Sequence, residues 1–177
     1  TAEIVAQVQG LEGREAKALL GYALSRDYHL VRSQGLQRVQ DRRLSRYRFR
    51  HHLFWQYLYA RLDDAERAYL HEAVGATLES LYAAADDHDT SRATRLAWHF
   101  ERAGLIDKAV LYRRRAGDEA MRLAACEEAI AHYMHALALL ATQPASPART
   151  EQETALRYAL SSPLSIARGW GGPEARS

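Results

Sequence analysis

The sequence predicts a mainly α-helical protein in two parts, with one small β-hairpin in the first part. Two patterns predict this fold. Between residues 93 and 140, small and apolar residues recur with the 3.6-residue period of an α-helix, whereas between residues 28 and 50 apolar and polar residues alternate as in a strand. The chain has 177 residues, 47% of them hydrophobic and 26% charged. This composition suits one medium-sized domain or two small ones.

Residues 2–26 predict two helices. Gly10 and Gly13 separate them, and the acidic stretch 12–15 favours the start of the second helix through its dipole. The apolar faces of the two helices consist of Ile4, Val5 and Val8 and of Leu19, Leu20, Ala23 and Leu24.

Residues 28–50 predict a β-hairpin. Tyr28 and Leu30 begin the alternation, and Tyr47 and Phe49 alternate with arginines on a returning strand that has one solvated face. The polar and basic stretch 37–45 is expected to form the tip. Two helices followed by a twisted hairpin are typical of a winged helix, so we expect residues 1–62 to form a winged-helix-like domain.

Helices are expected to resume at His51. Asp63 and Glu66 have the spacing of a capping box and predict the start of a second, longer helix. The small and acidic segment 83–90 predicts a loop. The residues expected to face inward are Leu53, Phe54, Tyr57, Leu58 and Leu62 in the first helix and Leu70, Val74, Thr77, Leu78 and Leu81 in the second.

Three further helices are predicted between residues 90 and 140, each with a seam of small residues and an aromatic residue on one face. Such seams let helix backbones approach closely, so we expect residues 63–177 to form an antiparallel stack of helices. Gly104 should end the first helix, Asp107 should cap the second, and Pro163 should kink a last one. Segments 142–147 and 169–173 predict turns. The seam residues are Ala93, Leu96, Ala97 and Phe100, then Ala109, Tyr112, Ala116, Ala120 and Leu123, then Cys126, Ala129, Tyr133, Ala136 and Leu140.

This stack resembles the tetratricopeptide repeat. The matching residues are Leu96, Ala97 and Phe100 for the first helix of a repeat and Ala129, Tyr133 and Ala136 for the second. Small residues recur after twenty positions, as from Ala109 to Ala129, rather than after the roughly thirty-four of the family. We therefore expect the helix over residues 107–123 to be the second helix of one unit and the first of the next.

The tract Phe49-Arg50-His51, followed by an aromatic helix and the repeat-like stack, resembles the region after the nucleotide-binding module in signal-transduction ATPases with numerous domains. The resemblance implies a bacterial, cytoplasmic regulatory arm of a large transcriptional regulator or adenylate-cyclase-associated ATPase, cut from a longer protein within the repeats. It implies that ATP binds only to an upstream module of the same chain, which the winged helix contacts, with His51 as one contact. The fragment itself is expected to hold no cofactor and to be no enzyme.

An arginine-rich tract forms the main charge cluster of the sequence. A wing lined with arginine could follow a phosphate backbone, but alternating arginines are also the solvated face expected of a half-buried hairpin. The net charge of +2 gives no strong electrostatic footprint, so DNA binding is the weaker alternative. The candidate contacts with nucleic acid or with the nucleotide module are Arg42, Arg43, Arg46, Arg48, Arg50 and His51.

The sequence lacks the motifs of common catalytic sites. It contains neither Gly-x-x-x-x-Gly-Lys-Ser/Thr nor Gly-x-Ser-x-Gly. Its one cysteine, Cys126, excludes an internal disulfide, and a zinc site with His132 and His135 is disfavoured because the cysteine falls on the seam and the histidines fall off it. No apolar run approaches membrane-spanning length, so no membrane partner is expected.

Binding by shape is the remaining function. We expect a protein or peptide partner in a groove of the repeats, with Trp98 as anchor, because an aromatic beside arginines is typical of binding hot spots. Alternatively, Trp98 packs against the helix that ends near Tyr82. A stand-alone peptide-binding scaffold is a further alternative, and the open end of the stack could pair with a second copy. The predicted groove residues are Thr94, Trp98, Glu101, Arg102, Arg114, Asp118, Met121 and Arg122.

Overall fold

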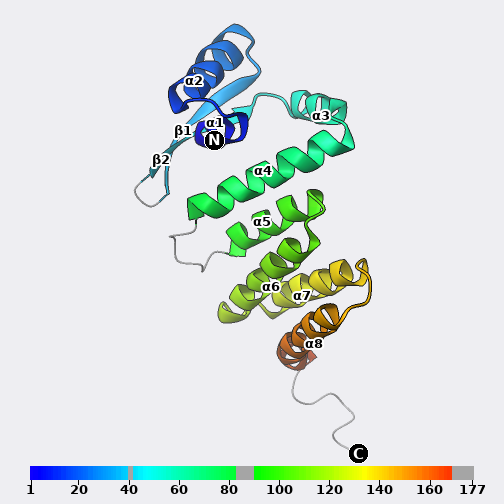
Figure 1. Ribbon diagram of the computed structural model, residues 1–177. Helices are drawn as coiled ribbons and strands as arrows, with labels where there is room; N and C mark the ends of the chain where they lie inside the picture. Colours follow the sequence, from blue (N-terminus) through cyan, green and yellow to red (C-terminus); the bar gives the residue numbers. More distant parts are fainter. Residues whose placement is uncertain (40–41, 83–89, 169–177) are drawn as a thin grey trace, which may run out of the picture. The chain divides into compact units, whose positions relative to one another are not determined.

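The structure is a computed structural model that describes residues 1–39, 42–82 and 90–168. The chain forms two compact units, Thr1–Ala85 and Asp86–Ser177. Helices dominate it, and the first unit also holds a two-stranded antiparallel sheet (Figure 1). The predicted fold class is confirmed at this level.

The first unit begins with the two helices predicted for residues 2–26, the second of which continues from α2 into a π-helical segment, η1. Ala2, Ala6, Ala16 and Leu20 are buried there. The elements of this unit are α1 (Ala2–Gln9), α2 (Gly13–Ala18), η1 (Leu19–Asp27), β1 (Val31–Val39), β2 (Arg42–Phe49), α3 (His52–Arg61) and α4 (Asp64–Tyr82).

The hairpin is longer than the sequence predicts. β1 and β2 pair from Val31 opposite Phe49 to Val39 opposite Arg42, with a register shift between Ser33 and Leu36. The predicted tip over residues 37–45 is therefore wrong, and residues 40–41 lie outside the described residues. Backbone groups make the ladder, so arginine side chains that stay in solvent do not end a strand.

Helices α1 and η1 hold the hairpin in place. The backbone N–H of Ser45 donates a hydrogen bond of 2.9 Å to Glu3 Oε2. Gly21 lets the Tyr47 hydroxyl approach, since a Cβ at position 21 would lie 3.3 Å from that oxygen. Val31 and Leu44 are buried. These contacts use backbone groups or uncharged side chains of the hairpin, and the arginine side chains that the structure describes on its strands are exposed.

Helix α3 contradicts its predicted inward face. Leu53, Phe54, Tyr57 and Leu58 are all exposed, and no residue of α3 is buried. The apolar pattern predicts a helix, but burial needs a neighbouring element along its whole length. Within the first unit α3 contacts β2 and, through Tyr59, α4.

Helix α4 starts at the predicted capping box. The Asp63 N–H donates to Glu66 Oε2 (3.0 Å) and the Glu66 N–H donates to Asp63 Oδ1 (2.7 Å). α4 contacts α1, so the compact unit includes α4, and the domain boundary predicted between residues 62 and 63 stays a prediction. Residues 83–89 of the predicted loop lie outside the described residues.

The second unit is a stack of helices in which consecutive helices pack against each other, as Figure 1 shows. Ala97, Ala109, Ala116, Ala129 and Ala136 are fully buried, so the predicted seams are confirmed. The helices are α5 (Thr90–Arg102), α6 (Ile106–Arg122), α7 (Cys126–Ala141) and α8 (Pro147–Arg168).

Details at the helix ends differ from the prediction. Leu123 is 67% exposed because it follows the last residue of α6. Asp107 does not cap α6: Leu105 holds the N-cap position, and Asp107 Oδ1 accepts a hydrogen bond from Gln143 Nε2 (3.2 Å). Pro163 is buried inside α8, and its predicted kink stays a prediction. The predicted turn over residues 169–173 lies outside the described residues.

The two turns that join α5, α6 and α7 are equivalent after twenty residues. The N–H of Leu105 donates to Phe100 O, and the N–H of Ala125 donates to Ala120 O, both at 2.9 Å. Gly104 and Ala124 both have positive φ, 75° and 56°. The recurrence of small residues in the sequence therefore corresponds to one helix plus one turn.

No helix in the described ranges combines the length and the apolar character that crossing a bilayer requires.

Candidate anion-binding site

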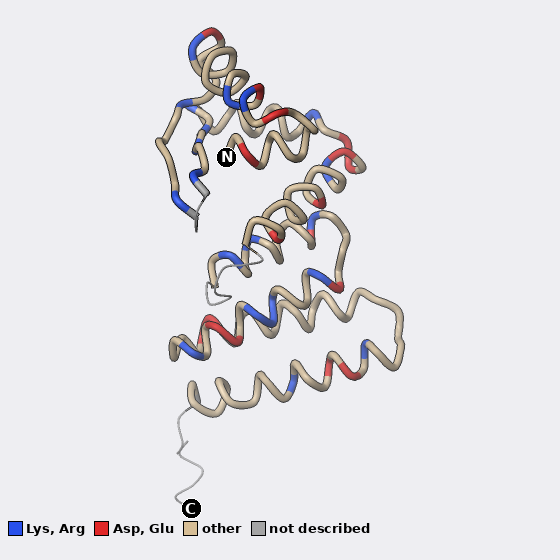
Figure 2. Tube along the Cα trace, turned by 60° about the vertical axis from the view of Figure 1, so that its left-hand side comes forward, with Lys and Arg blue, Asp and Glu red and all other residues tan. Residues whose placement is uncertain are grey.

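The hairpin concentrates arginine on both of its strands, and its described residues include no Asp or Glu (Figure 2). The register places Arg32 directly opposite Arg48. Like charges in this arrangement destabilise a hairpin. A bound anion between them would offset that repulsion. The arginines on the described strands are Arg32, Arg38, Arg42, Arg43, Arg46 and Arg48.

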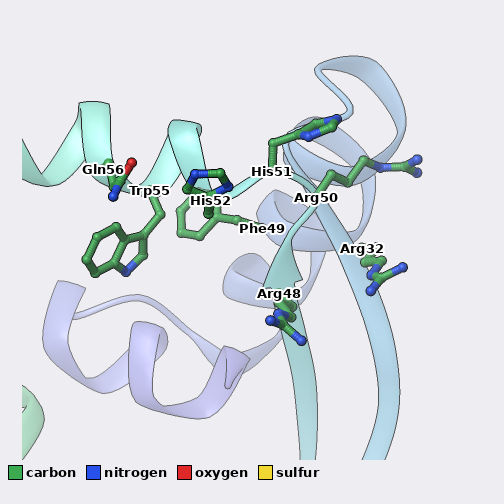
Figure 3. Close-up of a pocket in the computed structure, with 8 residues that line it drawn as sticks. All are labelled: Arg32, Arg48, Phe49, Arg50, His51, His52, Trp55 and Gln56. Atoms are coloured by element: carbon green, nitrogen blue, oxygen red, sulfur yellow. The ribbon is translucent and has the colours of Figure 1, made fainter.

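A pocket of about 690 Å³ lies where β2 leads into α3. Figure 3 shows the arginines on the hairpin side, Trp55 and Gln56 on the α3 side, and Phe49 with His52 between them. Among the described residues that line it, none is acidic. Three guanidinium groups beside two imidazoles favour an anionic ligand, because arginine binds phosphate and carboxylate with two parallel hydrogen bonds. The lining residues are Arg32, Arg48, Phe49, Arg50, His51, His52, Trp55 and Gln56.

Backbone geometry fixes the mouth of the pocket. The Arg50 N–H donates to Leu30 O at 2.9 Å, and Arg50 Nε donates to Val31 O at 3.4 Å. His51 is the N-cap residue of α3, but its side chain makes no capping hydrogen bond. Its ring instead meets Phe54 edge-on, with 5.8 Å between the centroids. The His51 imidazole is therefore oriented by an apolar contact and keeps its nitrogens for other partners.

The structure brings together half of the predicted basic residues. Arg48, Arg50 and His51 line the pocket, whereas Arg43 and Arg46 are exposed on β2 away from it. Arg42 begins β2, and its side chain lies outside the described residues. Their contacts with nucleic acid or with a nucleotide module stay predictions.

Sequence reasoning missed Arg32, His52 and Trp55. Arg32 reaches the pocket through its pairing with Arg48, which the bulge in β1 determines. Trp55 and Tyr59 are the two aromatic residues of α3 that the predicted inward face does not include. The sequence did contain one indication of the role of Trp55: it follows His51 by four positions, so on a helix the two residues lie on the same side.

The predicted groove residues are spread over α5 and α6, and their binding role stays a prediction. Trp98 is 41% exposed, and Thr94 and Met121 are half-buried. Arg102 is exposed, and Arg122 donates two hydrogen bonds of 2.9 Å to Glu119. Arg114 Nε lies 3.9 Å from Asp118, whose Oδ1 accepts a hydrogen bond from the Tyr133 hydroxyl (2.7 Å).

Glu101, another predicted groove residue, joins three helices. Its carboxylate lies 3.2 Å from Arg113 Nη2 on α6 and 3.2 Å from His135 Nε2 on α7. Arg113 is only 9% exposed. Glu101 is therefore engaged by the stack itself, which sequence reasoning did not predict.

His132 is buried, contrary to the prediction that it falls off the seam. Burial lowers the pKa of His132, and the positive charge of Arg113 lowers it further, while Glu128 opposes this effect. Among the described residues, no group of three or more His, Cys, Asp or Glu could hold a metal ion.

The stability of the second unit should depend on pH through His132. A histidine with a lowered pKa contributes stability above its ordinary pKa of about 6.5, and that stability is lost as the pH falls, because the unfolded chain binds the proton more readily. We expect the melting temperature to fall between pH 7.5 and 5, and His132→Asn to flatten this slope. Exposed His29→Asn is the control. Equal slopes for wild type and His132→Asn would contradict the prediction.

Comparison of the chain with protein-family models, curated proteins and solved structures found no match.

Proposed function

We propose that this chain is a non-catalytic regulatory arm of a bacterial, cytoplasmic multidomain signalling ATPase or transcriptional regulator. In this proposal the first unit contains a winged helix that reads the phosphate groups of a nucleotide held by an upstream module. The second unit is a tetratricopeptide-like array that captures a protein or peptide partner. The single observation that carries the proposal is the pocket at the hairpin, where Arg48, Arg50 and His51 line one cavity.

The chemistry of the pocket favours phosphate over other ligands. Arg32 and Arg48 repel each other across the hairpin, so the free pocket is electrostatically costly and a multiply charged anion relieves that cost. His51 and His52 add ring N–H donors to the same lining. A phosphate group gained or lost by hydrolysis would therefore change the occupancy of this pocket.

Two features support a partner-binding role for the second unit. Its helices are held together by apolar seams, and Trp98 remains 41% exposed on α5. An exposed tryptophan beside charged residues is a typical anchor for a protein partner. A stand-alone scaffold would use the same surface without any phosphate pocket, so the pocket favours the regulatory arm.

DNA binding is the second candidate. Arg43 and Arg46 lie on β2 outside the pocket, where a wing would follow a phosphate backbone. In that case arginines inside and outside the pocket would contribute about equally, and affinity would fall steeply with salt.

Isothermal titration of the chain with inorganic pyrophosphate tests the proposal. Arg48→Gln is expected to weaken binding about ten- to a hundredfold, because it removes a charge-assisted hydrogen bond worth roughly 1.5–3 kcal/mol. Arg46→Gln, the matched control on the same strand, should change binding less than twofold.

Three results would contradict the proposal. The first is the absence of a binding heat with millimolar pyrophosphate. The second is an equal loss of pyrophosphate affinity in Arg46→Gln and Arg48→Gln together with binding of duplex DNA at low salt, which would favour DNA binding. The third is a parent gene that encodes no phosphate-binding loop outside residues 1–177.

A further inference from the structure

We infer that the nucleotide whose phosphates this pocket reads also stacks its base on Trp55, so that the pocket contacts both ends of the ligand. This inference rests on the proposed function and adds to it the residue that recognises the organic part of the ligand.

Trp55 lies at the opposite end of the pocket from the arginines. It comes from α3 together with Gln56, while Arg32, Arg48 and Arg50 come from the hairpin and the residue that follows it, and Phe49 and His52 lie between the two ends (Figure 3). The Trp55 side chain is 49% exposed. An elongated ligand with a planar apolar end and an anionic end matches this order of side chains.

The Trp55 ring is held in place before any ligand binds. It stacks on Tyr59 with 5.7 Å between the centroids and an interplanar angle of 9°. The Tyr59 hydroxyl forms a hydrogen bond of 3.0 Å with Nε2 of buried His71 on α4. Arg67 adds a hydrogen bond to Tyr59 O (3.2 Å) and a guanidinium over the Tyr59 ring (5.2 Å).

This support separates Trp55 from its neighbours on α3. Leu53, Tyr57 and Leu58 are also exposed, but they do not line the pocket. A side chain that faces a cavity and is fixed by a second layer of contacts has the arrangement of a recognition residue, because little entropy is lost when the ligand binds.

The size of the pocket favours a mononucleotide over a nucleic-acid strand. Its volume of about 690 Å³ falls within the range of small-molecule sites. A single-stranded nucleic acid usually needs successive aromatic platforms along a groove. Among the described residues lining this pocket, Trp55 is the aromatic that faces solvent, while Phe49 is half-buried.

Titration of the chain with ADP and with inorganic pyrophosphate tests the inference, with tryptophan fluorescence as a second readout. Wild type is expected to bind ADP about tenfold more tightly than pyrophosphate, because base stacking on an aromatic side chain adds affinity. Trp55→Ala should lower the affinity for ADP to that for pyrophosphate and leave the pyrophosphate affinity unchanged. Trp55→Phe should keep part of the preference for ADP. Tyr57→Ala, an exposed aromatic on the same helix, is the matched control and should retain it.

The outcomes separate the two proposals. Equal affinity of wild type for ADP and pyrophosphate overturns the role of Trp55 and leaves phosphate recognition standing. Binding of neither ligand overturns both. An equal loss of ADP and pyrophosphate binding in Trp55→Ala would show that Trp55 only supports the fold. Tighter binding of an oligothymidylate than of ADP would assign the pocket to single-stranded nucleic acid. Either result overturns the inference.

Discussion

Gly117→Val is expected to lower the free energy of unfolding of the second unit by about 1–3 kcal/mol, and its melting temperature by roughly 5–20 °C. A Cβ at position 117 would lie 2.5 Å from Cε1 of Tyr133, which is closer than packed carbon atoms approach. The Tyr133 ring packs directly against the α6 backbone here because position 117 has no side chain. Differential scanning calorimetry measures the effect.

Tyr133 cannot move aside to accommodate the added atoms. It is buried, and its hydroxyl donates to Asp118 on α6 at 2.7 Å. Burial and this hydrogen bond raise the pKa of Tyr133 well above its ordinary range, so the hydroxyl remains a donor at neutral pH.

Two controls identify the clash as the cause. Gly13→Ala adds a Cβ that meets no atom within 4 Å and should change stability little. Tyr133→Ala in the Gly117→Val background should cost less than it does alone, since it removes the ring that the valine contacts. Strict additivity of the two substitutions would contradict the prediction.

Arg113→Met is expected to destabilise the second unit by about 2–3 kcal/mol. The substitution leaves Glu101 without its arginine partner. Loss of one partner of a buried ion pair costs about 3–5 kcal/mol, and the partial exposure of Glu101 reduces this cost. Arg113 Nε is itself buried with no hydrogen-bond partner in the described part of the chain. The pair is therefore imperfectly compensated even in the native state.

The double variant Glu101→Leu/Arg113→Met should recover most of this loss, because apolar replacements of similar volume remove both desolvated charges. Urea denaturation of the two single variants and the double variant measures the coupling. Arg115→Met, an exposed arginine on the same helix, is the control. A double variant less stable than either single variant would show that the ion pair itself stabilises the stack.

The helices of the second unit and the start of α4 in the first unit could be predicted because their signals are local. Alanines at a 3.6-residue period define the face of α6 that is buried against its neighbours, and Asp63 with Glu66 define the start of α4 by direct hydrogen bonds. Neither feature depends on distant parts of the chain.

The exposed face of α3 could not be predicted in the same way. The period of Leu53, Tyr57 and Leu58 indicates which side of a helix is apolar, but not whether another element covers it. The prediction that His132 lies off the buried seam was wrong for the opposite reason. Helix α7 packs against both α6 and α8, so a polar residue beside its seam is buried as well.

The pocket was predictable only in part because it depends on register. Arg48, Arg50 and His51 are consecutive or nearly so, and their shared location follows from the chain itself. The contribution of Arg32 depends on the irregularity between Ser33 and Leu36, and that of Trp55 on the helical turn after His51. The sequence pattern of a single segment therefore does not show that Arg32 and Trp55 line the same pocket.

Because the turns at Gly104 and Ala124 match, the repeating unit of this stack is one helix with its turn and not a pair of helices. A tandem duplication of Leu105–Ala124 would place the same type of turn at both ends of the inserted helix. Because consecutive helices run in opposite directions, such an event would send everything downstream out of the other end of the stack. One duplicated segment of this length could therefore redirect the helices that follow it.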